Sequence, residues 1–333
     1  MNKLSFLSLL GFLLTLVGLA PAAAQTIRRV NNTGITGTNI YADLPAAYAA
    51  AAAGDIIQVE PSGTAYSGIA VNKNVTIVGP GYFLDPSQNA GLQANPLPAT
   101  VSTIEVQAGG ANAYIAGLTI SGTFYIEASN VTVQRCNIGT LYVNGSNQIG
   151  TPQTLTNVII RQNYINQVYA YYSMDNILFT NNIFVSSINI PASYNGGFYN
   201  NVLLASATLN NLFVTNNYFT ASPGGAGNTF NNNISAQAFT TAYPNVNGNL
   251  ANVPQSSVFV LAPGATAFDA WYQLKAGTNP ARGTGQGGID VGAFGGTTPY
   301  KLGGLPNIPA IYQEALTISG NSLNVTLSTR ANN

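Results

Sequence analysis

Few side chains in this sequence can do acid–base or metal chemistry, and they are scattered along the chain. The 333 residues include ten Asp and Glu, ten Lys and Arg, one Cys and no His. Without His there is no Ser-His-Asp or Cys-His dyad, and a single Cys excludes a Cys-rich zinc site and an internal disulfide. The acids form no adjacent pair or cluster, which argues against a paired-carboxylate hydrolase and a Ca²⁺ site. We therefore expect no catalytic residue, no metal and no cofactor.

Three charged residues provide the alternative to that expectation. Arg135 and Arg161 fall in neighbouring sequence repeats, so they could lie on neighbouring coils and face solvent. With Glu127 they could contact an anionic sugar or act as the base of a lyase. The simpler interpretation, which we favour, is a solvated pair of arginines that keeps the surface soluble.

Aromatic residues form the second group of candidates. Tyrosines crowd the central and later part of the chain, some at strand positions that should point outward. Exposed rings along one face can bind the faces of sugars or form a protein interface, whereas inward rings simply pack. The candidate binding residues are Tyr164, Tyr169, Tyr171, Tyr172 and Tyr218.

These side chains must be positioned by a repeated strand. Four segments open with Asn and then alternate apolar residues, beginning at Asn130, Asn157, Asn176 and Asn211. Alternation with period two indicates strands that bury one face. The repeat length of about 16 to 27 residues is too short for a strand, a helix and a second strand, and it is typical of one coil of a parallel β-solenoid.

One position of the repeat predicts an asparagine ladder. Coils stack about 4.8 Å apart, so amides at one turn position can bond to each other, and Asn tolerates the left-handed conformation that we expect there. Cys136 should be a small buried residue that ends the ladder rather than a reactive thiol. The predicted column is Cys136, Asn163, Asn182, Asn201, Asn217 and Asn233.

The organisation along the chain follows from composition. Residues 1–24 combine Lys3, an apolar run and Ala22–Ala24, which is typical of a signal peptide cleaved after Ala24. Residues 25–55 should hold a strand and a helical cap over 43–53, and residues 56–297 the parallel β-helix. Residues 298–333 should form a Pro-rich linker and a β-hairpin tail.

Two surfaces could take part in assembly. Ile159, Leu178 and Phe213 should face outward in one apolar stripe, if the strand alternation holds. The tail, residues 313–333, either folds back on its own solenoid or adds to the sheet of a neighbouring subunit.

Two stretches of sequence resemble secreted right-handed parallel β-helix proteins of the pectate-lyase-like superfamily from Bacteroidetes-type bacteria. One runs from Gly54-Asp55-Ile-Ile-Gln-Val to Asn74-Val-Thr-Ile-Val-Gly-Pro-Gly81, and the other is Gly288-Ile-Asp-Val-Gly-Ala-Phe-Gly-Gly296. The resemblance implies a right-handed parallel β-helix. With the helical cap and the hairpin that the residues themselves predict, the expected fold is an all-β, single-stranded right-handed parallel β-helix with an N-terminal helical cap and a C-terminal hairpin tail. The resemblance says little about activity, since the superfamily includes lyases, hydrolases and adhesins.

The function predicted from the sequence is that of a non-catalytic extracellular or cell-surface structural protein, able to self-assemble into a filament or surface layer. The alternative is a polysaccharide-binding or polyuronide-cleaving β-helix protein. A formal charge of zero argues against nucleic-acid partners. The apolar run near the start is short for a membrane span, so we expect none in the mature chain.

Overall fold

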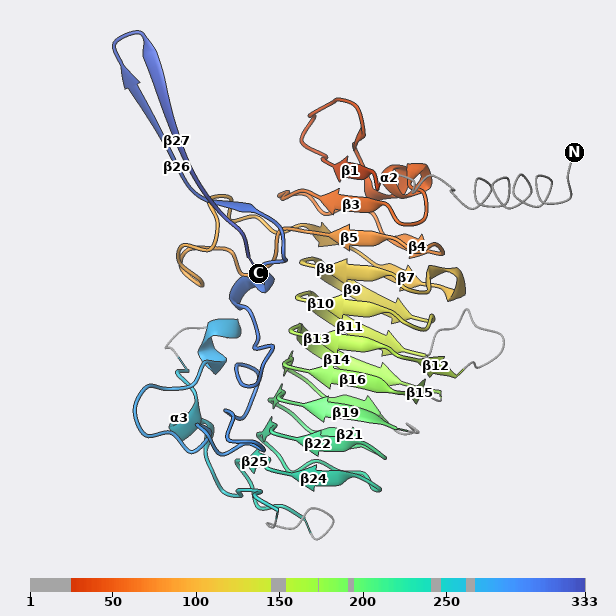
Figure 1. The fold of residues 1–333 in the computed structure, drawn as a ribbon, viewed down its shortest axis with the longest axis vertical. Coiled ribbons are helices and arrows are strands. Elements are labelled where there is room, and N and C mark those ends of the chain that lie inside the picture. The colour runs from red at the N-terminus through yellow and green to blue at the C-terminus, as the bar shows by residue number, and fades with distance from the viewer. Residues whose placement is uncertain are drawn as a thin grey trace, which may run out of the picture.

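The chain winds into coils that stack along one axis, and each coil adds short strands to sheets shared by the whole stack (Figure 1). The computed structural model describes residues 25–144, 154–172, 174–190, 195–240, 247–261 and 267–332. The predicted signal peptide, residues 1–24, lies outside the described residues. Within them the strands of successive coils pair in parallel, and the predicted all-β, single-stranded right-handed parallel β-helix is confirmed.

Two long sheets form the walls of the solenoid. The first contains β1 (Ile27–Val30), β2 (Ile40–Tyr41), β3 (Ile56–Val59), β5 (Thr76–Val78), β8 (Tyr114–Ala116), β10 (Thr132–Gln134), β13 (Ile159–Arg161), β16 (Ile177–Thr180), β19 (Gly196–Tyr199), β22 (Phe213–Thr215) and β24 (Thr229–Asn231). The second contains β4 (Ile69–Val71), β6 (Thr100–Val101), β7 (Ile104–Val106), β9 (Thr119–Ile126), β11 (Asn137–Val143), β14 (Tyr164–Ala170), β17 (Ile183–Phe184), β18 (Ile188–Ile190), β20 (Val202–Leu203), β21 (Ala207–Leu209), β23 (Tyr218–Phe219) and β25 (Ile234–Ser235). A small pair is made by β12 (Leu155–Thr156) and β15 (Met174–Asp175).

The core lies inside the coils, where the alternating apolar residues stack in columns. Val133 pairs with Ile160, Ile160 with Phe179, and Phe179 with Phe198, and all four are fully buried. A buried side chain of this kind stabilises the fold by about 1.5–3 kcal/mol. The inward residues of the predicted alternation therefore pack against one another from coil to coil.

The second sheet bends within its long strands. The pairing of β9 with β11 shifts between Ile138 and Thr140, where Gly139 stands. A Cβ on Gly139 would lie 2.8 Å from the carbonyl oxygen of Gly122 in the preceding coil. The bend divides the sheet into two arms, one continued by β17, β20, β23 and β25 and the other by β18 and β21.

The N-terminal end of the stack is covered by a short helix, α2 (Leu44–Ala50). Asp43 caps it, since its side chain accepts a hydrogen bond from the Ala46 amide at 2.8 Å. Lys73 Nζ donates to the carbonyl oxygens of Tyr48 and Ala51 at the other end. The helix stops at Ala50 rather than at residue 53, because Ala51 is already extended.

The coils end earlier than expected. Among the described residues, the last parallel bridge between coils joins Ile234 and Leu250, whereas the sequence placed the end of the solenoid at residue 297. From there the chain runs back along one side of the stack toward its N-terminal end (Figure 1). We call residues 284–307 the returning segment. The helices of this part are α3 (Gln255–Val258), η2 (Asp269–Tyr272) and η3 (Leu302–Gly304), and the coils themselves hold η1 (Ala108–Gly110).

The predicted hairpin tail is present as β26 (Ala310–Ser319) and β27 (Ser322–Arg330), paired antiparallel. It projects away from the coils (Figure 1). Within the described part of the chain, the hairpin is attached to the body at its root. Arg330 Nη2 donates to the Leu92 carbonyl at 2.7 Å, and the Ala94 amide donates to the Ile311 carbonyl at 2.8 Å.

Candidate functional site

The predicted ladder residues stand in one buried column and are joined by hydrogen bonds from coil to coil. Asn163 Nδ2 donates to Asn182 Oδ1 at 3.0 Å, and Asn182 Nδ2 donates to Asn201 Oδ1 at the same distance. Cys136 ends the column, with its backbone amide donating to Asn163 Oδ1 at 2.9 Å. Asn249 extends it beyond Asn233 by one further coil. Sequence reasoning missed Asn249 because no alternating strand follows it.

The left-handed backbone was expected at the ladder residues, and it lies one residue earlier. Asn181, which precedes ladder residue Asn182, has φ 56°, and Asn200, which precedes Asn201, has φ 51°. This placement turns a second side chain outward in six successive coils. The left-handed turn residues are Arg135, Gln162, Asn181, Asn200, Asn216 and Asn232.

These turn residues bind the returning segment. Toward the N-terminal end of the stack, each coil binds a later part of the segment. We call this row of contacts the seam. The bonds run from Asn232 to the Thr284 carbonyl, from Asn200 to Asp290, from Asn181 to Ala293 and Gly295, from Gln162 to Thr298 and Pro299, and from Arg135 to Leu305. The turn side chains therefore take part in folding, and this use could be recognised only once the returning segment was placed.

Arg135 is one of these turn residues, and its environment differs from the solvated one expected. It is 4% exposed, and its guanidinium donates to Gln162 Oε1 at 2.9 Å and to the Leu305 carbonyl at 2.7 Å. Burial, with a smaller effect of Arg161, lowers its pKa. Because these bonds join the coils to the returning segment, Arg135 is poorly placed to act as a base.

Arg161 lies beside it and is more accessible. Its Nε donates to Gln134 Oε1 at 2.9 Å. Both arginines line a pocket of about 290 Å³ between β10, β13 and the returning segment. Glu127, the third member of the proposed lyase set, follows β9 and does not line this pocket. The structure brings the two arginines together without the carboxylate.

The five candidate tyrosines divide into two groups. Tyr164 and Tyr218 are buried under the C-terminal part of the chain, where Tyr164 meets Phe83 edge to face and Tyr218 meets Phe259. Burial raises the pKa of both. These two rings belong to a second apolar cluster between the solenoid and residues 253–261 and 267–300, and a sugar cannot reach them.

Tyr169 and Tyr171 lie in an outward stack, with two rings that sequence reasoning missed. Tyr142 stacks on Tyr125 at 5.2 Å, on Tyr169 at 5.3 Å and on Tyr171 at 5.8 Å between ring centroids. Tyr125, Tyr142 and Tyr169 occupy matching positions of the paired strands β9, β11 and β14. This shared register is the signal that could have identified Tyr125 and Tyr142. Because the rings cover one another's faces, mainly edges remain for a ligand. Tyr172 is exposed outside the stack.

The expected apolar stripe is a column of the first sheet, with one position that the sequence did not show. Ile159 pairs with Leu178, Leu178 with Gly197, and Gly197 with Phe213. A Cβ on Gly197 would lie 2.1 Å from the Tyr199 ring, which therefore covers the glycine. Of the three predicted residues, only Phe213 is more than half exposed.

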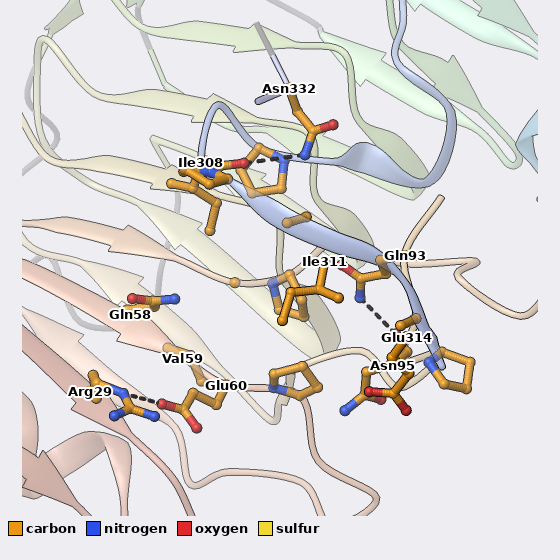
Figure 2. Close-up of a pocket in the computed structure, with 18 residues that line it drawn as sticks. Arg29, Gln58, Val59, Glu60, Gln93, Asn95, Ile308, Ile311, Glu314 and Asn332 are labelled. Atoms are coloured by element: carbon orange, nitrogen blue, oxygen red, sulfur yellow. Dashed lines mark hydrogen bonds and ion pairs between the residues drawn. The ribbon is translucent and has the colours of Figure 1, made fainter. Parts of the chain in front are cut away.

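A larger pocket, of about 660 Å³, lies between the first strands and the root of the hairpin. Figure 2 shows Arg29, Glu60, Gln93 and Glu314 around it. Glu60 is held by an ion pair with Arg29 and by Asn31 Nδ2 at 2.6 Å. A carboxylate held in this way supports the N-terminal coil.

Asp269, at the start of η2, is a buried carboxyl that the sequence did not single out. It accepts hydrogen bonds from Asn89 Nδ2 at 2.8 Å and from the Gly303 amide at 2.7 Å. Burial raises its pKa to about 6, although these bonds oppose the shift. Asp269 joins η2 to Gly303 in the C-terminal part and to Asn89 in the loop between β5 and β6. It is fully buried, so no substrate can reach it.

In the described part of the chain, no group of three or more His, Cys, Asp and Glu side chains is arranged to hold a metal ion. No helix among the described residues is long and apolar enough to cross a membrane.

Comparison with known proteins adds little to this geometry. No family model and no curated protein matches the sequence. Among solved structures, the crystal structure of pectate lyase Pel9A is similar, with 13% sequence identity and a TM-score of 0.45 over 82% of this chain and 97% of that one. A likeness this distant carries no argument about activity, and the fold stated above comes from the strand pairing.

Proposed function

We propose that this protein is a non-catalytic extracellular or cell-surface structural protein that assembles with copies of itself through the hairpin β26–β27. The observation that supports the proposal is the exposed apolar face of that hairpin. Its side chains are Leu316, Ile318, Leu323, Val325 and Leu327, each between 53% and 81% exposed.

The face follows from the register of the two strands. Leu316 pairs with Val325, and Ile318 pairs with Leu323. Since side chains alternate across a strand, these four residues lie on one side, and Thr317 with its partner Asn324 lies on the other. The hairpin is therefore strongly two-sided, and its apolar side meets no other described part of the chain.

The hairpin also carries open edges. Between Glu314 and Arg330 it has no charged residue. Natural edge strands are usually protected by charges, prolines or bulges, and a two-stranded hairpin alone is at best marginally stable in water. We infer that these strands become stable by pairing or packing with another surface.

A second copy of the chain is the partner that fits this surface best. The one charge on this side is Glu314, opposite Leu327 at the root of the hairpin. From Leu316 to the tip the face carries no charge or buried polar group that would select a different protein, and two identical apolar faces are complementary by symmetry. The stripe on the first sheet is a weaker candidate, because Ile159 and Leu178 are already partly buried.

The test compares two lysine substitutions at neighbouring positions of one strand. Ile318→Lys places a charge in the proposed interface, and Thr317→Lys places the same charge on the opposite side. We expect the wild type and Thr317→Lys to form dimers or longer assemblies in light scattering and electron microscopy. Ile318→Lys should weaken association by at least about tenfold, since a charge buried in an interface is costly.

Three results would contradict the proposal. A wild-type protein that stays monomeric at all accessible concentrations would exclude self-assembly. Assemblies that persist after deletion of residues 310–333 would show that another surface is responsible. Equal effects of the two lysines would show that the apolar face does not matter.

Export is part of the proposal, and it rests on the sequence of residues 1–24. The expected result is that the protein recovered outside the cytoplasm begins at Gln25, as N-terminal sequencing or mass spectrometry would show. Recovery of an intact chain from the cytoplasm would contradict it.

A further inference from the structure

Positive charge is concentrated at the upper end of the seam. Arg135, Arg161 and Lys301 line the pocket of about 290 Å³, and none of its lining residues is Asp or Glu. The whole chain has only ten Lys and Arg. The neighbouring pocket, of about 460 Å³, is lined by Arg135, Lys301 and Arg330, again without a carboxylate. Such a gathering is unusual in a protein of so few charges.

The two guanidinium groups are held in place by a pair of glutamines. Gln134 Nε2 donates to Gln162 Oε1 at 2.7 Å, and Tyr114 donates to Gln134 Oε1 at 3.1 Å. The same two oxygens accept from Arg161 Nε and Arg135 Nε, each at 2.9 Å. Both arginines are thus positioned before any ligand arrives.

The hydrogen bonds that position the two arginines use only some of their guanidinium N–H donors. Arg161 is bonded through Nε, and within the described residues neither of its Nη atoms has an acceptor. Arg135 uses Nε and Nη1, and its Nη2 has no acceptor among the described residues. Lys301 Nζ also makes no hydrogen bond or ion pair in the described part of the chain. The pocket therefore contains N–H donors on three cationic side chains.

The oxygens that do contact Arg135 are neutral. They belong to the Gln162 and Asn307 side chains and to the Leu305 carbonyl. Burying a cation is costly unless an opposite charge compensates it, and Arg135 is 4% exposed. A bound anion would supply the missing compensation for Arg135 and for its neighbour Arg161.

We propose that Arg135, Arg161 and Lys301 form a binding site for a tetrahedral oxyanion, that is, a phosphate or sulfate group. A carboxylate offers two oxygens in one plane, whereas phosphate and sulfate offer four that point in different directions. Donors that come from two coils and from the returning segment match the second arrangement. The pocket volume of about 290 Å³ suits one such group and not an extended chain.

The site has a structural consequence. Arg161 belongs to the coils and Lys301 to the part of the chain that runs back over them. An anion bound by both would join the two, so it would stabilise the folded chain by mass action. This inference is independent of assembly through the hairpin.

The test measures binding of inorganic phosphate and sulfate to the purified protein by calorimetry at low salt, and the shift in melting temperature that they cause. Saturable binding with a Kd of about 1 mM or tighter is expected. Acetate represents a carboxylate ligand, and it should bind at least about tenfold more weakly than phosphate. Glucose 6-phosphate distinguishes two sources of the group: binding indicates that a phosphate ester is accepted, and its absence restricts the site to the free ion.

The matched variants are Arg161→Gln, Lys301→Gln and, as the control, Arg282→Gln. Each removes one positive charge, but Arg282 lies outside the pocket and pairs with Asp290. The first two should each weaken phosphate binding by about tenfold or more, and the control should leave it unchanged. Circular dichroism confirms that each variant is folded.

No saturable binding by the wild type would overturn the site. Acetate bound as well as phosphate would overturn the tetrahedral class. An equal effect of all three variants would show that only net charge matters. Arg135 is left intact, because its guanidinium also holds the returning segment through the Leu305 carbonyl.

Discussion

Asn201 donates its side-chain amide to Asn217 Oδ1 at 3.0 Å, one coil further along the stack. The Oδ1 of Asn201 in turn accepts from the side-chain and backbone amides of Asn182. Its Nδ2 also reaches the Phe179 carbonyl. One buried side chain thus connects three successive coils, and a shift of register by a single residue would break all four bonds.

Replacing Asn201 by Ala should therefore be costly. Each buried polar group left without a partner costs about 1–3 kcal/mol, so we expect a total loss of about 3 kcal/mol in the free energy of unfolding, measured in urea. The matched control is Asn189→Ala, an exposed position of a coil strand, which should change it by less than about 0.5 kcal/mol. Similar losses for both variants would show that the ladder contributes no special stability.

The thiol of Cys136 should be unreactive in the folded protein. It is fully buried, and burial raises its pKa to about 12. At pH 8 only about one thiol in 10,000 would be ionised, and the thiolate is the reactive form. We expect no labelling by a maleimide over hours in buffer and complete labelling in urea, with Cys136→Ser as the blank. Rapid labelling of the folded protein would contradict the buried end of the ladder.

The coils and the ladder could be predicted from the sequence because they repeat. An alternation such as Val158–Ile160 and the recurrence of Asn163 at Asn182 depend only on local spacing, which stacking then reproduces in space. The role of Arg135 could not be found in this way. It depends on the Leu305 carbonyl, 170 residues later, in a segment with no repeat.

The tyrosines show the same limit. Tyr164 and Tyr169 stand in one strand, yet one is buried and the other lies in the outward stack. Alternation says which residues point out of the coil. It does not say that residues 253–261 and 267–300 then cover one outward column and leave the other open.

Asp269 should make stability depend on pH between about 4 and 6. Its folded pKa of about 6 lies above the value of about 3.9 for an unfolded Asp, because burial favours the protonated form. A raised pKa contributes stability below pH 4 that is lost as the pH rises through 6, by about 3 kcal/mol in all. Asp55 has the opposite effect on stability at lower pH. Burial tends to raise its pKa, but bonds from Ala52, Thr26 and Arg28 lower it overall, so its contribution to stability is lost as the pH falls.

The measurement is urea unfolding at several pH values from 4 to 7.5. The wild type should become less stable as the pH rises through 6, and Asp269→Asn should lose this slope even if it is less stable throughout. The variant can be less stable at every pH, because an amide has one acceptor oxygen and cannot accept the hydrogen bonds of both Asn89 and Gly303. The pH dependence, and not the absolute stability, therefore tests the role of Asp269. A slope that survives in Asp269→Asn would assign it to another group.

The seam can be tested with two substitutions that have the same backbone effect. Asn181 and Asn157 both have φ 56°, so glycine fits each position, and the added freedom of the unfolded chain is the same for both. Asn181→Gly removes the donor to the buried contacts at Ala293 and Gly295.

Asn157→Gly removes two exposed bonds, one that Asn157 donates to Asn130 and one that it accepts from Asn176. We expect Asn181→Gly to be less stable than Asn157→Gly by about 1–3 kcal/mol. The seam holds a segment without regular strands against the coils, so Asn181→Gly should also speed protease cleavage within residues 284–307. Equal stability and equal cleavage of the two variants would show that the returning segment is held by its apolar contacts alone.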